Sequence, residues 1–126
     1  MSETNVLGGE LEVCSVDPVT GWLRDGTCNT APEDVGSHTI CAVMSSEFLD
    51  HQLGIGNDLI TPMPAFQFPG LQPGDRWCVT ARNWLRAHRE GVAAPVVLAA
   101  THEKALEIVP LQILEDYAVD VPDDPG

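Results

Sequence analysis

Basic residues are scarce in this chain of 126 residues. Six lysines and arginines stand against 19 aspartates and glutamates, Lys104 is the single lysine, and the formal net charge at pH 7 is −13. Such an acidic surface repels the phosphates of nucleic acids and anionic lipid headgroups. We therefore predict no nucleic-acid partner and no membrane partner. The excess of acid indicates a solvated acidic coat and, in a sharper interpretation, a halophilic protein, because salt screens the repulsion among carboxylates.

Long apolar runs are also absent. The longest, Val92–Ala100, has nine residues and is interrupted by Pro95, whereas a membrane-spanning helix needs about 20. The first residues, Met-Ser-Glu-Thr-Asn, lack the basic and apolar blocks of a secretory signal. The sequence therefore predicts a soluble protein in the cytoplasm.

No Cys-x-x-Cys pair occurs, although the chain has four cysteines, Cys14, Cys28, Cys41 and Cys78. A chain of this size without a secretory signal does not need disulfides for stability, so reduced thiols are expected. Structural zinc sites are usually built from close ligand pairs, and the spacing of these cysteines matches no compact zinc finger. We therefore predict no metal and no cofactor.

The length fits one compact domain, and an apolar content of 44% fits a globular core. Residues 5–118 are predicted to form this domain. Residues 1–4 are predicted to be a disordered N-terminus, and residues 119–126, rich in aspartate and proline, an acidic disordered tail.

Hydrophobic patterning places strands and helices in no regular alternation. Strands are expected at residues 11–14, 39–44, 75–79, 96–100 and 105–109, and helices from Ser45 or Ser46 to Leu53, from Thr80 or Ala81 to Glu90, and from Pro110 to about Ala118. Residues 54–75 alternate proline with glycine and carry many apolar side chains, which predicts a packed loop. The predicted fold class is α+β, a single-domain two-layer α/β sandwich with this long Pro/Gly-rich packed loop.

Six strings of residues spread over the chain carry a resemblance to a known family. They are Asn5-Val-Leu-Gly-Gly, Thr20-Gly-Trp-Leu-Arg-Asp-Gly-Thr-Cys28, Asp34-Val-Gly-Ser-His-Thr-Ile-Cys41, Gly56-Asn-Asp-Leu, Phe68-Pro-Gly-Leu-Gln-Pro-Gly-Asp-Arg-Trp-Cys78 and Thr101-His-Glu-Lys-Ala-Leu106. Together they resemble the bacterial domain of unknown function family numbered 2237, from about Asn5 to Ala118. The resemblance implies a stand-alone α+β two-layer domain, and the family has no established activity, ligand or catalytic residue to carry over.

One position departs from the family's pattern. The resemblance implies a second cysteine two residues after Cys78, and Thr80 stands there. This departure argues against a metal site or redox pair built on a Cys-x-Cys at that place.

Cys28, Asp34, His38 and Cys41 form the most suggestive cluster of reactive residue types. A thiol becomes a nucleophile beside a base, and a histidine oriented by a carboxylate supplies one. Cys28 would then be the nucleophile, His38 the base and Asp34 the orienting acid. The structural interpretation is that the cysteines are buried apolar residues, Asp34 caps a turn and His38 bonds the backbone. With Cys14 or Cys78 added, the same side chains could instead bind zinc.

Four arginines form a second candidate site. Arg82, Arg86 and Arg89 recur on one face of the helix expected at 80–90, and Arg76 lies on the strand before it. Guanidinium groups on one face suit the capture of carboxylates or phosphates. In so acidic a chain, however, the first partners available to them are its own carboxylates.

Asn57 and Asp58 open the long loop. They could line a cleft together with Asp34 and His38, or form an Asx turn with their own backbone, which is the commoner role of such residues.

The sequence thus favours a non-catalytic binding or interaction module that uses the loop surface and the arginine helix, with a small anionic ligand or a protein as partner. The alternatives are a thiol-dependent enzyme built on Cys28 and His38, or a Cys/His metal-binding protein.

Overall fold

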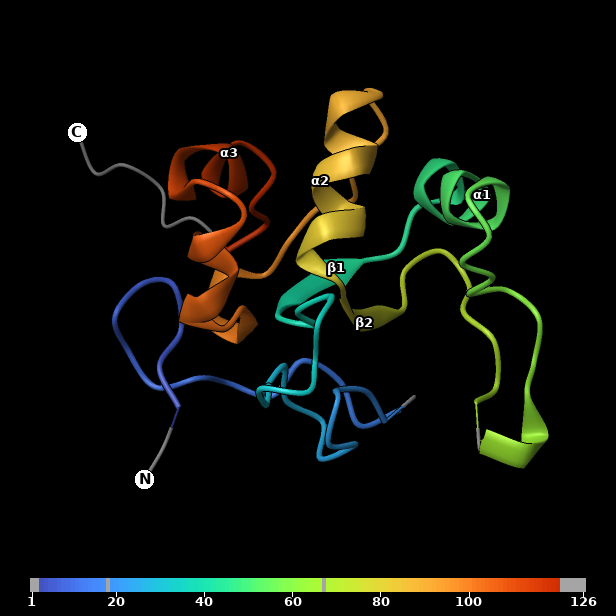
Figure 1. Cartoon of the computed structure of the whole chain (residues 1–126), viewed down its shortest axis with the longest axis horizontal. Helices are drawn as coiled ribbons and strands as arrows, with labels where there is room; N and C mark the ends of the chain where they lie inside the picture. The colour runs from blue at the N-terminus through green and yellow to red at the C-terminus, as the bar shows by residue number, and fades with distance from the viewer. Residues whose placement is uncertain (1–2, 18, 67, 121–126) are drawn as a thin grey trace.

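The computed structural model describes residues 3–17, 19–66 and 68–120 (Figure 1). The described residues before 40 form turns and coil with isolated bridges. The elements that follow, with η denoting a 3-10 helix, are β1 (Ile40–Val43), α1 (Ser46–Gly54), η1 (Pro64–Phe66), β2 (Arg76–Val79), α2 (Ala81–Arg89), η2 (Leu98–Ala100), η3 (Glu103–Glu107) and α3 (Leu111–Asp116).

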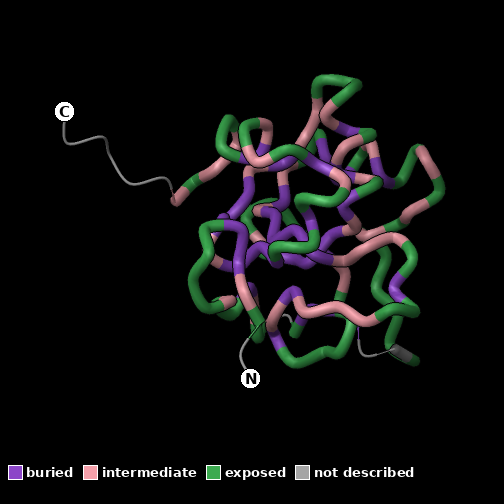
Figure 2. Tube along the Cα trace, turned by 60° about the vertical axis from the view of Figure 1, so that its left-hand side comes forward, coloured by how far each residue is buried: buried purple, intermediate pink, exposed green. Residues whose placement is uncertain are grey.

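The two strands β1 and β2 pair antiparallel, with Cys41 opposite Cys78 and Ala42 opposite Trp77. Neighbouring residues of a strand point to opposite faces of the sheet. On one face Ala42 and Trp77 join the main apolar core with the helices, whereas on the other Cys41 and Cys78 join a smaller cluster with Cys14, Cys28, Val97 and Ala100. Figure 2 shows the buried segments gathered at the centre of the molecule. The sheet therefore separates the helices from the cysteines.

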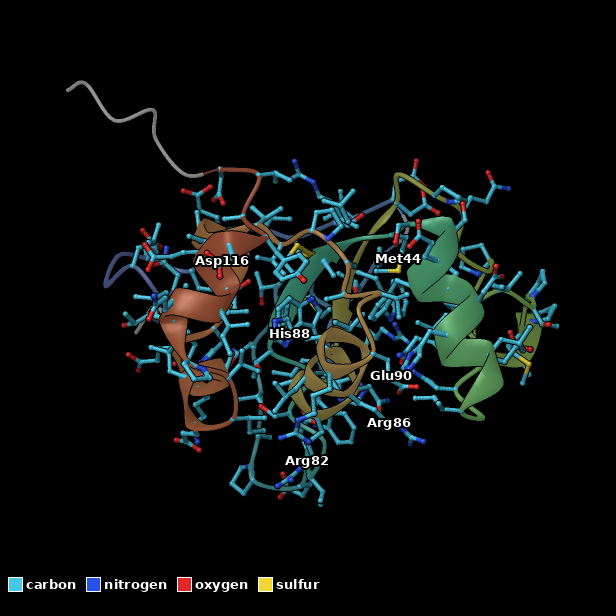
Figure 3. All side chains as sticks on the ribbon, turned by 90° about the horizontal axis from the view of Figure 1, so that it is seen from above. Met44, Arg82, Arg86, His88, Glu90 and Asp116 are labelled. Atoms are coloured by element: carbon cyan, nitrogen blue, oxygen red, sulfur yellow. A yellow bond between two sulfur atoms is a disulfide. The ribbon has the colours of Figure 1, made fainter. Side chains whose placement is uncertain are left out.

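The three α-helices of the described chain lie next to one another, with α2 between α1 and α3 (Figures 1 and 3). The hydroxyl of Ser45 accepts a hydrogen bond from the Phe48 N–H, and that of Thr80 accepts one from the Asn83 N–H. Each cap satisfies an N–H that the first turn of a helix leaves without a partner. The predictions of helices at these two places are confirmed.

The strand predicted at 96–100 is wrong. Val96 makes isolated bridges with Ala42 of β1 and with Ala118. The Asp120 carboxylate then accepts hydrogen bonds from the N–H groups of Leu98, at 2.7 Å, and Ala99, at 2.9 Å. These two hydrogen bonds lie in η2, where the chain leaves the extended conformation instead of lengthening the sheet.

The strands predicted at 11–14 and 105–109 are also wrong. Residues 11–14 hydrogen-bond to separate segments, since the N–H of Glu12 donates to Ala99 and that of Cys14 to Gly26. Residues 105–107 belong to the 3-10 helix η3 instead. His102 caps the first turn of η3, because its ring Nδ1 accepts a hydrogen bond from the Lys104 N–H at 3.0 Å. In both places tertiary hydrogen bonds and a helix cap determine the backbone conformation, and the β-branched residues there do not pair with a neighbouring strand.

Parts of both predicted disordered ends contact the domain. The carbonyl of Glu3 accepts a hydrogen bond from Leu11, that of Thr4 accepts one from Glu103, and the Val119 N–H donates to Val96. Residues 3–4 and 119–120 are therefore part of the folded unit. The disorder predicted for residues 1–2 and 121–126 falls outside the described residues.

Helices and a small antiparallel sheet make this an α+β fold, as predicted. The sheet has two strands in the described chain, and the two-layer sandwich stays a prediction. None of the helices within the described ranges is long and apolar enough to cross a membrane.

The loop at residues 54–75 packs at its end and exposes its tip. Phe68 and Leu71 are buried in the main core, whereas Met63 is 46% exposed. Gly70 has φ +80°, and a Cβ there would collide with the carbonyl oxygen of Ile60. Glycine thus lets two parts of the loop lie against each other.

Candidate functional site

A cavity of about 380 Å³ opens between the long loop, β2 and the coil before β1. Ligand sites in proteins are usually concave and mostly apolar, with a few polar groups that fix orientation. Its lining residues are Gly21, Trp22, Arg24, His38, Asp58, Leu59, Met63, Phe68, Trp77 and Cys78.

The segment at residues 20–27 is fixed against β2 at one side of this cavity. The hydroxyl of Thr20, which is fully buried, accepts a hydrogen bond from the Cys78 N–H at 2.8 Å. Gly21 follows with φ +105°, and a Cβ there would collide with the Thr27 carbonyl oxygen. Only glycine fits this turn, which presents Trp22 and Arg24 to the cavity.

Aromatic rings form much of the wall. Phe68 and Trp77 meet edge to face with their centroids 5.1 Å apart, and the Trp22 ring lies 5.5 Å from the His38 ring. Trp22 is 41% exposed, so this part of the wall is open to solvent. Such ring faces bind planar apolar groups well.

Arg24 supplies a positive charge at the wall. Its guanidinium carbon lies 4.8 Å from the centroid of the Trp77 ring, a cation–π distance. Among the described residues Arg24 makes no ion pair. Its N–H donors are therefore open to an anionic group in the cavity.

His38 and Asp34 are paired, as the sequence suggested. The ring Nδ1 of His38 lies 2.6 Å from Oδ1 of Asp34, whose side chain is almost fully buried. The other carboxylate oxygen accepts hydrogen bonds from the His38 N–H at 2.7 Å and the Thr30 hydroxyl at 2.9 Å. This arrangement both caps the turn and orients the ring, so the catalytic and the structural interpretations share the same contacts.

Burial raises the pKa of Asp34, but the hydrogen bonds from the His38 ring and N–H and the charge of His38 outweigh it, and the net pKa lies below its usual value. Asp34 is therefore ionised near neutral pH and can only accept hydrogen bonds. Nδ1 of His38 must then donate. Nε2 is left as the available ring nitrogen, and no described residue hydrogen-bonds to it.

Asp58 lines the cavity and forms an Asx turn at the same time. Its Oδ1 accepts hydrogen bonds from the N–H groups of Ile60, at 2.9 Å, and Thr61, at 3.0 Å. Hydrogen bonds from the Thr61 side chain and from both N–H groups lower its pKa. Asn57 does not line the cavity, because its side chain donates to buried Gln52 at 2.8 Å.

The prediction of reduced thiols is wrong. Cys14 is bonded to Cys41, and Cys28 to Cys78, so the four cysteines form two buried disulfides and leave no free thiol. Spacing alone hid this pairing, because the partners are 27 and 50 residues apart in the sequence and meet only where the folded chain packs the coil before β1 against β1 and β2. Cys28 does not line the cavity, whereas its partner Cys78 lies there with His38.

The sulfur atoms of Cys14, Cys28 and Cys78 lie within 4.8 Å of one another. A metal would need thiolates, and a disulfide sulfur is not a thiolate. In the oxidised state this cluster is therefore not a set of metal ligands. His38 and Asp34 bond to each other and are not in this sulfur cluster.

The four predicted arginines lie outside the cavity, on the exposed surface of β2 and α2. Figure 3 labels Arg82 and Arg86 along α2. Arg82 donates to the Val35 carbonyl at 3.5 Å, and Arg86 lies 3.8 Å from Glu90. In the described chain this is their one ion pair, so the arginines are not neutralised by the protein's own acids to the extent expected.

Sequence reasoning missed Trp22, Arg24 and Trp77 as cavity residues. A signal for them was present, because every lining residue except Met63 falls within four of the strings that carry the family resemblance. Those strings are far apart in the chain and meet around one cavity.

The sequence matches no curated protein. It does match a family model over residues 4–118, and that model describes an uncharacterised protein conserved in bacteria. This range includes all the residues that line the cavity and all four cysteines. The chain therefore belongs to the DUF2237 family of bacterial proteins, as its resemblance predicted.

Proposed function

We propose that this protein is a non-catalytic binding module whose cavity holds a small ligand with a planar apolar body and one anionic group. The observation that carries the proposal is the contact between Arg24 and Trp77 at 4.8 Å in a cavity of about 380 Å³. It places on an aromatic wall a cation that has no ion pair among the described residues. A planar group would lie against the rings of Trp22, Phe68 and Trp77, and its anionic group would accept hydrogen bonds from Arg24.

The charges around the cavity favour a single negative charge on the ligand. Arg24 attracts an anion, but Asp58 lies in the same wall and the whole chain carries −13. Each further negative charge on a ligand would meet this repulsion. Nε2 of His38 offers one more polar contact, as an acceptor for a ligand N–H or O–H while the ring is neutral.

Isothermal titration calorimetry with 1-naphthoate, a planar monoanion, tests the proposal against the neutral 1-naphthamide. We expect naphthoate to bind more tightly. Arg24→Gln should raise its Kd about tenfold, the loss of one charge-assisted contact, and should remove the preference over the amide. The matched control is Arg89→Gln, which removes the same charge from exposed α2 and should leave the Kd within about twofold.

The indole N–H signals in NMR spectra locate the bound probe. The signals of Trp22 and Trp77 should shift on addition of naphthoate. Trp84 is an internal reference, because it is buried in the core and its Nε1 donates to the Ala94 carbonyl at 2.9 Å. Equal affinity of Arg24→Gln and Arg89→Gln, or no shift at Trp22 and Trp77, would overturn the proposal.

Three features of the sequence interpretation stay predictions beside this proposal. A protein partner on the exposed arginines of α2 has support in the ion pairs of the described residues, among which Arg86–Glu90 is the one that involves these arginines. The halophilic interpretation rests on the charge of −13. The cytoplasmic location has no further support in the structure. In a reducing cytoplasm disulfides are usually transient and serve catalysis or redox sensing.

A further inference from the structure

The two disulfides lie side by side on the face of the sheet that is remote from the helices. Cys41 and Cys78 project from opposite positions of β1 and β2, and Cys14 and Cys28 come from the coil before them. The sulfurs of Cys14, Cys28 and Cys78 all lie within 4.8 Å of one another. One sulfur of the first disulfide is thus adjacent to both sulfurs of the second.

We propose that these two disulfides form an exchange relay, in which Cys14 is the residue that links the Cys28–Cys78 pair to Cys41. A disulfide is exchanged when a thiolate attacks one of its sulfurs, and the reaction needs the attacking and attacked sulfurs to come into contact. A separation below 4.8 Å lets small side-chain movements bring them together. The sulfur of Cys41 is not in the mutually adjacent set, so exchange through Cys41 itself is disfavoured.

The cavity is the route by which a reductant would approach this relay. Cys78 lines the cavity, whereas Cys14, Cys28 and Cys41 do not. In this relay a small dithiol reductant enters by the cavity and attacks Cys78, which is buried at 1% exposure but is the one cysteine among the lining residues. His38 lines the same cavity, and Nε2, the nitrogen opposite the one held by Asp34, can accept the proton that the incoming thiol loses.

The steps balance with one dithiol as the reductant. Its first thiolate attacks the sulfur of Cys78, and Cys28 leaves as a thiolate. The Cys28 thiolate attacks Cys14, forming a Cys14–Cys28 bond, and Cys41 leaves as a thiolate. The second thiolate of the reductant then breaks its mixed disulfide with Cys78. The reductant becomes a disulfide, and the protein gains two electrons and two protons as thiols on Cys41 and Cys78.

This relay depends on the sulfur positions and not on the ligand of the proposed binding module. Failure of one proposal therefore leaves the other standing.

Two single variants test the proposal with opposite expectations. Cys41→Ser leaves a thiol on Cys14, beside the Cys28–Cys78 disulfide, and Cys14→Ser leaves a thiol on Cys41, outside the adjacent set. Each is held at pH 8 with EDTA and no added thiol, quenched in acid, unfolded and alkylated with N-ethylmaleimide. Trypsin cuts after Arg24 and Arg76, which separates the peptides of Cys14, Cys28 and Cys78 for mass spectrometry. In the Cys14→Ser digest, cleavage after Glu33 separates Cys28 from Cys41.

In Cys41→Ser we expect disulfides between Cys14 and Cys28 or Cys78, with an alkylated thiol on the remaining cysteine. In Cys14→Ser we expect an intact Cys28–Cys78 bond and alkylated Cys41. Full alkylation of Cys14 in Cys41→Ser, or equal exchange in the two variants, would overturn the proposal.

The wild-type protein gives the same test without a substitution that could impair folding. Partial reduction with dithiothreitol, followed by the same acid quench and mapping, should yield species with one disulfide that joins Cys14 to Cys28 or Cys78. If every such species retains one of the two original pairs, Cys14–Cys41 or Cys28–Cys78, the relay does not operate.

Discussion

Cys41 and Cys78 face each other across the antiparallel strands β1 and β2, yet each forms its disulfide with a cysteine of the preceding coil rather than with the other. The Cys14–Cys41 bond spans 27 residues and the Cys28–Cys78 bond spans 50. Together they attach the coil, which has few regular hydrogen bonds of its own, to the two strands at the centre of the fold. The cavity wall at Gly21, Trp22 and Arg24 lies in this attached coil.

Loss of either disulfide should destabilise the protein. Closing loops of 27 and 50 residues restricts the unfolded chain, and each bond should contribute about 3 to 4 kcal/mol to the free energy of unfolding. The double variants Cys14→Ser/Cys41→Ser and Cys28→Ser/Cys78→Ser remove one bond each without leaving a thiol. Guanidinium unfolding followed by far-UV circular dichroism measures the loss.

Wild-type protein in excess dithiothreitol is the control. With both bonds reduced, its free energy of unfolding should be lower than that of either double variant. An unfolding midpoint unchanged by either pair of substitutions would show that the corresponding bond does not hold the fold.

Asp34→Asn should destabilise the protein in a pH-dependent way. The folded state lowers the pKa of Asp34 through the hydrogen bonds of His38, although burial opposes this. The stabilisation is therefore present above the unfolded pKa of about 3.9 and is lost as the pH falls through the lower folded value. At pH 7 we expect the Asp34→Asn change to lower the free energy of unfolding by about 2 kcal/mol or more, since charged hydrogen bonds are removed from a buried site.

Urea unfolding at pH 7 and at about pH 3 measures this difference, which should narrow at the lower pH. Asp58→Asn is the matched control, because it removes the same charge from an exposed turn that asparagine also forms. If the difference in free energy of unfolding between wild type and Asp34→Asn stayed constant with pH, the lowered pKa of Asp34 would not be the source of the stabilisation.

Local signals predicted the helices and the two strands. Ser45 and Thr80 are N-caps with a hydroxyl that bonds the third residue on, Gly91 adopts φ +79° just after α2, and Pro110 precedes α3. Each of these signals acts within one turn of chain. The strand expected at 96–100 fails for the opposite reason: the N–H groups of Leu98 and Ala99 donate to Asp120, some 20 residues later.

The same distinction explains what could be predicted of the site. Asp34 and His38 are four residues apart, and their pairing follows from a local turn. Arg24 and Trp77 meet only because Thr20 and the Cys28–Cys78 bond hold distant segments together. The disulfides were missed because redox state was inferred from the expected compartment, and no residue pattern reports which cysteines a fold will join.

Gly21→Ala should disrupt the cavity wall more than Gly74→Ala, in which the positive φ is the sole obstacle to a side chain. Gly21 and Gly74 both have positive φ, +105° and +96°, but a Cβ at Gly21 would collide with the Thr27 carbonyl oxygen, whereas a Cβ at Gly74 meets nothing within 4 Å. Gly74→Ala should therefore cost about 1 kcal/mol of stability from its φ alone. Gly21→Ala should cost more than about 2 kcal/mol, because the backbone at residues 21–27 must also move.

Thermal unfolding of the two variants measures this difference, and naphthoate titration shows whether the wall has moved. Gly74→Ala should bind the probe like wild type, because Gly74 does not line the cavity. Gly21→Ala should bind it more weakly, since Trp22 and Arg24 follow this turn directly. Equal stability and equal affinity of the two variants would mean that the turn yields to a Cβ without moving either side chain, and Gly21 would then have no part in placing the cation on the aromatic wall.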